Sequence, residues 1–110
     1  MAEIDGSILD RLFATVASRR DADPAISYTA QLMRAGRPRI ARKLGEEAIE
    51  TMLAAVAGNA RDVIGESADL LYHLLVLWAD AGVAPQEVWQ ALEARMAASG
   101  IAEKESRARS

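Results

Sequence analysis

Residues 66–78 read ESADLLYHLLVLW, and this stretch decides the fold class. Beyond Ala68 almost every position is apolar, so a helix here lacks the broad polar face of an ordinary surface helix. Asn59 is a helix-capping residue on one side of the stretch, and Gly82 is a common helix terminator on the other. We therefore expect a central helix over about 60–81 that is packed on several sides by other helices.

The remaining helices are predicted from apolar residues at helical spacing and from the breakers between them. Ile4, Ile8, Leu12 and Val16 have this spacing, and Asp5 or Ser7 is the expected cap of their helix. No strand alternation appears. The sequence predicts an all-α antiparallel bundle of about five helices, over about 4–19, 27–35, 38–57, 60–81 and 85–100.

Size and composition limit the class of protein. The chain has 110 residues, a formal charge of −3 and no cysteine. We expect one domain over 1–110, with 1–26 as an N-terminal helix and loop and 100–110 as a polar tail. The acidic balance gives no reason to expect a nucleic-acid partner, and no apolar run reaches the ~18 residues of a membrane span. The N-terminus does not resemble a signal peptide, so a soluble cytoplasmic protein is expected.

Carboxylates gather at two places that flank the connection between the third and fourth helices. The set is Glu46, Glu47, Glu50, Glu66 and Asp69. Residues three or four apart share one face of a helix, and a short connection makes these two helices antiparallel neighbours. The two acidic faces can therefore meet.

A solvated helix face is the ordinary explanation for such glutamates, and it is preferred for Glu46–Glu50 taken alone. Two features favour a metal site instead. No Lys or Arg follows these glutamates by three or four residues, so the usual ion-pair rationale is missing. The second acidic pair also lies directly before the apolar run of the most apolar helix, where charged residues are not expected. Because every available ligand is an oxygen, Mg²⁺ suits the set and Mn²⁺ is an alternative.

A basic run, RAGRPRIARK, occupies residues 34–43 directly before the glutamates. Arg42 and Lys43 are candidates to contact phosphates, whereas Arg37 and Arg39 are expected to be solvated. Basic residues beside an acidic metal site are what a nucleotide polyphosphate requires. No Walker-type glycine loop is present, so phosphate binding would depend on the metal.

Four segments together resemble the phosphoribosyl-ATP pyrophosphatase family, within the all-α MazG-like superfamily of nucleoside triphosphate pyrophosphatases. They are SYTAQL at 27–32, ARKLGEEAIET at 41–51, ESADLLYHLLVL at 66–77 and SGIAEKESR at 99–107. The family's acidic motif is matched without substitution. Residues 21–26 depart from the glycine-containing form of many members, which leaves the conformation of that loop open.

The resemblance implies Mg²⁺-dependent hydrolysis of phosphoribosyl-ATP to phosphoribosyl-AMP and pyrophosphate, the second step of histidine biosynthesis. Glu47, Glu50, Glu66 and Asp69 are then the expected metal ligands. Glu46 is either a further ligand or the base that takes a proton from water, and Glu47 and Glu50 complete the catalytic candidates. Many relatives carry a fused cyclohydrolase domain, for which this chain is too short, so a stand-alone pyrophosphatase is expected.

Further candidates for substrate or phosphate binding also have plain structural explanations. A lone histidine in an apolar helix is most often a hydrogen-bonded core residue, and a tyrosine hydroxyl needs a partner when buried. The candidates are Lys43, Arg42, Ser27, Tyr28, Tyr72 and His73. Capping and packing explain Ser27 and Tyr28 equally well.

The apolar fourth helix suggests a homodimer or larger homo-oligomer, because a small monomer cannot cover it. Trp78, Trp89 and Met96 are expected in the core or in such an interface. Two rival functions remain open. One is a house-cleaning (d)NTP pyrophosphatase of the same fold, and the other is a non-catalytic helical dimerisation module with a solvated acidic face.

Overall fold

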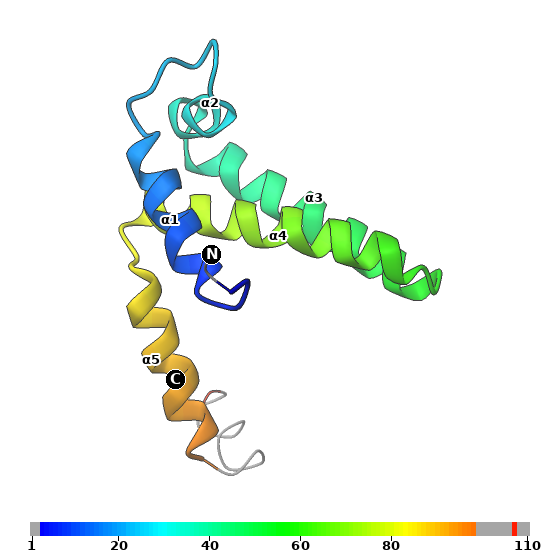
Figure 1. Cartoon of the computed structure of the whole chain (residues 1–110). Coiled ribbons are helices and arrows are strands. Elements are labelled where there is room, and N and C mark those ends of the chain that lie inside the picture. Colours follow the sequence, from blue (N-terminus) through cyan, green and yellow to red (C-terminus); the bar gives the residue numbers. More distant parts are fainter. Residues whose placement is uncertain (1–2, 99–106, 108–110) are drawn as a thin grey trace.

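The central position of the fourth helix is confirmed by the computed structural model, which describes residues 3–98 and Arg107. Within this part of the chain there are five helices and no strand. The helices are α1 (Ile8–Ser18), α2 (Tyr28–Ala35), α3 (Arg37–Val56), α4 (Ala60–Ala81) and α5 (Pro85–Met96). Helix α4 packs against α1, α2 and α3 (Figure 1). The fold is therefore all-α, as the sequence predicts.

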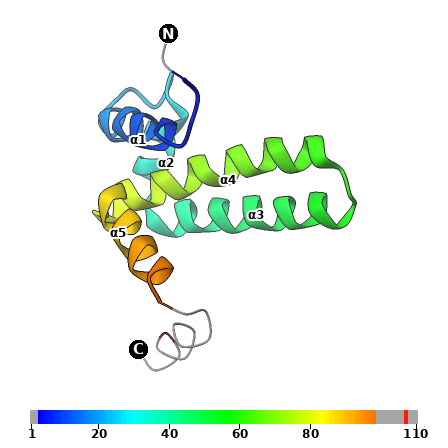
Figure 2. The ribbon, with the colours of Figure 1, turned by 60° about the horizontal axis from the view of Figure 1, so that its bottom comes forward.

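Helices α3 and α4 form an antiparallel pair because a tight connection reverses the chain between them (Figure 2). Gly58 has φ +75°, in the left-handed region that favours glycine. The Asn59 side chain then accepts a hydrogen bond of 3.1 Å from the Asp62 backbone N–H. At the other end, Gly82 takes up the left-handed conformation of a helix terminator. The predicted bounds of this helix are confirmed at both ends.

Asn59→Ala is expected to lower the free energy of unfolding by about 1 kcal/mol, because the N–H of Asp62 loses its acceptor. Chemical denaturation of both proteins measures this difference. Asn59→Asp keeps an acceptor oxygen and serves as the matched control. Equal losses in the two variants would mean that the cap contributes nothing.

The core lies where four helices meet, near the C-terminal end of α4. Its fully packed members are Val16, Leu32, Ile40, Val76 and Ala79. The distal half of the α3–α4 pair extends past α1 and α2 as an arm (Figures 1 and 2). Leu53 and Val56 lie on this arm and are therefore 57% and 82% exposed within this chain.

The predicted start of the first helix needs correction. Helix α1 begins at Ile8 and not near Ile4, because the Asp5 carboxylate accepts hydrogen bonds from the N–H and the hydroxyl of Ser7 in a turn. The Ser7 hydroxyl is thereby diverted from capping. The Arg37 side chain is 59% exposed, as expected of a solvated residue, and its Nε also donates to Asp80 Oδ2 over 2.8 Å. This ion pair joins the start of α3 to the end of α4.

Trp89 joins helix α5 to α4 and α1. Trp89 packs edge-on against Trp78 with ring centroids 5.8 Å apart, and its Nε1–H donates to Asp10 over 3.1 Å. Helix α5 ends at Met96, earlier than predicted. Met96 is 85% exposed, so of its two expected places, the core or an interface between copies, the core is excluded. The predicted polar tail lies outside the described residues except for Arg107.

None of the described helices combines the length and the apolar character that a membrane crossing needs.

Candidate metal centre

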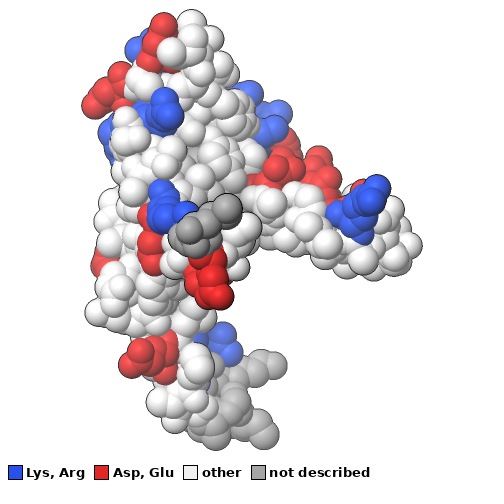
Figure 3. All heavy atoms as spheres, in the orientation of Figure 1, with Lys and Arg blue, Asp and Glu red and all other residues white. Residues whose placement is uncertain are grey.

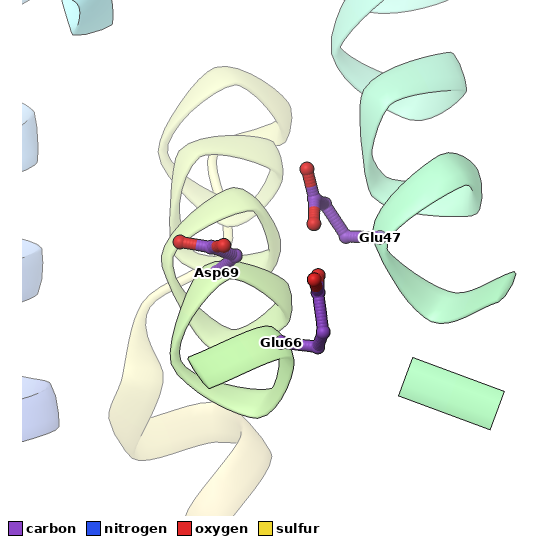
Figure 4. A group of neighbouring side chains, drawn as sticks. All are labelled: Glu47, Glu66 and Asp69. Carbon is purple, nitrogen blue, oxygen red and sulfur yellow. The ribbon is translucent and has the colours of Figure 1, made fainter. Parts of the chain in front are cut away.

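Three of the five predicted carboxylates come together between α3 and α4. Glu47 projects from α3 toward Glu66 and Asp69, which lie one turn apart on α4 (Figure 4). One carboxylate oxygen from each residue lies within 4.8 Å of the other two. The three carboxylates meet because the two helices are antiparallel, which places the middle of α3 opposite the first half of α4.

Two oxygens of this group are buried without any hydrogen-bond partner, namely Glu47 Oε2 and Glu66 Oε2. A buried carboxylate oxygen without a partner is costly, and several such charges together repel each other. A divalent cation at this point would supply the missing partner and remove the repulsion. Hard oxygen donors of this kind suit Mg²⁺, so the residues fit a bound divalent ion.

Glu50 lies beside the group and changes the acidity of its members. A proton shared with the Glu50 carboxylate, together with burial and the neighbouring negative charges, raises the pKa of Glu66 to about 7. Burial and then the Glu50 charge raise the pKa of Glu47 above its ordinary value. The group therefore holds protons at pH values where isolated glutamates have lost them.

This raised pKa predicts how the metal-free protein responds to pH. From about pH 4.5 to about pH 7 the folded protein retains a proton on Glu66 that the unfolded chain releases. The free energy of unfolding should therefore fall as the pH rises through this window. Urea denaturation in chelator at a series of pH values measures the slope. Glu66→Gln should lose most of this slope. Parallel profiles of unfolding free energy against pH for the two proteins would contradict the prediction.

Glu46 lies outside the group of three. Its carboxylate is 3.7 Å from the Lys43 Nζ, one turn earlier on α3. The successive positions 46 and 47 are turned by about 100° from each other, so only one of them can face α4. Arg42 is exposed on the same helix. Basic and acidic side chains accordingly adjoin each other over α3 (Figure 3).

The predicted tyrosine and histidine candidates form a network between α2 and α4. His73 is buried, with Nδ1 2.7 Å from the Asp69 carbonyl oxygen and Nε2 3.2 Å from the Tyr28 hydroxyl. Because a carbonyl oxygen can only accept, a neutral imidazole carries its proton on Nδ1, and the Tyr28 hydroxyl donates to Nε2. His73 thus links the start of α2 to the backbone of an acidic residue.

A second contact between these helices joins the hydroxyls of Thr29 and Tyr72. Sequence reasoning missed Thr29, although its place in the SYT segment beside two other candidates was an available signal. Ser27 accepts a hydrogen bond of 3.1 Å from the Ala30 N–H. Its structural role as the cap of α2 is therefore confirmed.

An all-helical fold with a carboxylate group shared by two antiparallel helices is the arrangement expected of the all-α nucleoside triphosphate pyrophosphatases. The family model described as phosphoribosyl-ATP pyrophosphohydrolase matches residues 9–96, which include every helix apart from the first residue of α1. This chain belongs to that family.

Individual relatives show the same likeness over nearly the whole length. A protein named phosphoribosyl-ATP pyrophosphatase from Azospirillum brasilense is 56% identical, with 97% of this chain and 98% of the relative covered. Its namesake from Paramagnetospirillum magneticum is 54% identical over 96% of each chain. A third, from Gluconobacter oxydans, is 56% identical over 91% of this chain and 75% of its own.

Proposed function

We propose that this chain is a phosphoribosyl-ATP pyrophosphatase. It hydrolyses the α–β phosphoanhydride of 1-(5-phosphoribosyl)-ATP with one water molecule, and the products are 1-(5-phosphoribosyl)-AMP and pyrophosphate. The observation that carries the proposal is the identity above 50% to relatives of this name along almost the entire chain. The reaction is the second step of histidine biosynthesis, which takes place in the cytoplasm.

The acidic residues have different roles in this reaction. Glu47, Glu66 and Asp69 hold Mg²⁺, and Glu50 completes the set from the adjacent turn of α3, with Mn²⁺ as a substitute. When bound, the ion neutralises phosphate charge and polarises the phosphoryl oxygens. The two partnerless buried oxygens of Glu47 and Glu66 support this assignment.

The remaining charged candidates act on the water and the phosphates. Glu46 accepts the proton of the attacking water, since its place outside the group of three leaves it without a ligand role. Lys43 and Arg42 contact phosphate oxygens, because both are on α3 just before the acidic group. Lys43 then exchanges its ion pair with Glu46 for one with the substrate.

Pyrophosphate release from phosphoribosyl-ATP and from dNTPs, measured side by side with and without chelator, tests the proposal. We expect Mg²⁺-dependent turnover with a clear preference for phosphoribosyl-ATP. A preference for dNTPs would make the chain a house-cleaning enzyme of the same fold. Absence of turnover with both substrates would favour a non-catalytic dimerisation module.

We also infer that the arm of α3 and α4 pairs with a second copy of this chain. Its exposed apolar residues include Ile49, Met52, Leu53, Val56 and Ile64. The radius of gyration of 16.0 Å exceeds the value of about 13 Å expected of a compact domain of this length. Burying these side chains against a partner would remove them from water. Sedimentation equilibrium tests this, and a monomer at all concentrations would contradict it.

A further inference from the structure

Tyr28 lies at the start of α2 and keeps part of its side chain open to solvent. Tyr72 is stacked on the other side, with ring centroids 6.2 Å apart and an interplanar angle of 23°. His73 packs edge-to-face with it at 5.9 Å and also engages its hydroxyl. Tyr28 is nevertheless 45% exposed. With Tyr72 on one side of the ring and His73 at its hydroxyl, the face opposite Tyr72 is the side on which a planar ligand could stack.

This open face belongs to the surroundings of the candidate metal centre. His73, which holds the Tyr28 hydroxyl, also contacts the Asp69 backbone carbonyl over 2.7 Å. The two contacts link the Tyr28 hydroxyl, through His73, to the backbone of Asp69, which lies one helical turn earlier on α4. In a nucleotide a single ribose joins the base to the α-phosphate. A group that binds the base must therefore neighbour the groups that bind the phosphates.

The proposed substrate has a base that suits such a ring. Phosphoribosylation at N1 makes adenine a much stronger base, so the ring of phosphoribosyl-ATP carries a positive charge near neutral pH, unlike the ring of ATP. Aromatic faces bind nucleobases by stacking and attract cations through the ring quadrupole. Resting on the proposed function, we infer that the open face of Tyr28 binds the adenine ring of phosphoribosyl-ATP and favours this N1-substituted ring over that of ATP.

Two substitutions separate the ring face from the hydroxyl. Tyr28→Leu removes the aromatic face, and we expect KM for phosphoribosyl-ATP to rise about tenfold or more, with a much smaller change in kcat. The inhibition constant of ATP should rise less. Tyr28→Phe keeps the face and should bind substrate more tightly than Tyr28→Leu. Leu92→Ala, at a similarly exposed apolar residue of α5, is the control for lost surface.

Calorimetric binding of phosphoribosyl-AMP, which keeps the base but has lost pyrophosphate, gives a readout independent of catalysis. We expect the same order: wild type and Leu92→Ala tightest, Tyr28→Phe next and Tyr28→Leu weakest. If wild type binds in this Tyr28-dependent way but releases no pyrophosphate, the proposed function fails and the inference stands.

Equal affinities in Tyr28→Leu and wild type, with normal wild-type turnover, would overturn the inference alone. A lower sedimenting mass for Tyr28→Leu would also overturn it, because the face would then be a contact between copies. A normal thermal midpoint for Tyr28→Leu establishes that the variant is folded.

Discussion

Glu66→Gln is expected to lower kcat for pyrophosphate release by on the order of 10²–10³-fold, a loss comparable to that of a principal charge-stabilising group in other enzymes. Glu66 carries one of the two buried oxygens without a partner. One of its carboxylate oxygens lies within 4.8 Å of a carboxylate oxygen of Glu47 and of Asp69. The amide keeps the shape of the side chain but removes the negative charge that attracts the cation. Asp69→Asn and Glu50→Gln should act in the same direction.

Steady-state turnover over a range of Mg²⁺ concentrations measures this effect. Glu93→Gln, at an exposed glutamate of α5, makes the same chemical change away from the group and should retain wild-type activity. If Glu50→Gln or Glu66→Gln kept full turnover at saturating Mg²⁺, the assignment of these ligands would be wrong.

Mg²⁺ is expected to stabilise the folded protein even without substrate. At about 100-fold over its Kd, one bound ion adds about 2.7 kcal/mol to the free energy of unfolding. For a chain of this size that corresponds to a rise in Tm of about 10 °C. The rise should be large near pH 8 and shrink below about pH 7, because Glu66 then holds a proton that must leave before an ion binds.

Thermal unfolding with Mg²⁺ and with chelator, at both pH values, checks this second result. Glu66→Gln should lose most of the rise and should melt higher than wild type in chelator, because the repulsion within the group is relieved. Glu93→Gln should behave as wild type. An equal response to Mg²⁺ in Glu66→Gln and wild type would show that the ion binds elsewhere.

The bounds of α2 and α4 were predictable because their signals are local. Ser27 and Asn59 cap α2 and α4 with their own side chains, and Gly82 ends α4 in a backbone conformation that few other residues adopt. These interactions span only a few residues, so the order of amino acids specifies them directly. The start of α1 was mispredicted because the Asp5 carboxylate competes for Ser7 in a turn that helical periodicity does not reveal.

The acidic site was predictable as a set of residues but not as an arrangement. Helical spacing puts Glu46, Glu47 and Glu50 on one broad face, and nothing in the spacing separates them. Packing against α4 does, since Glu47 meets Glu66 while Glu46 turns to Lys43.

The sequence by itself determined the all-α class, the central helix and the inventory of carboxylates, because composition, periodicity and caps act over short distances along the chain. Only the tertiary structure decided which oxygens are buried without partners, why the pKa of Glu66 is raised, and how His73 joins Tyr28 to the backbone of the acidic group. Those properties depend on burial and on charges brought together from α2, α3 and α4. The pairing of the helices in space produces them.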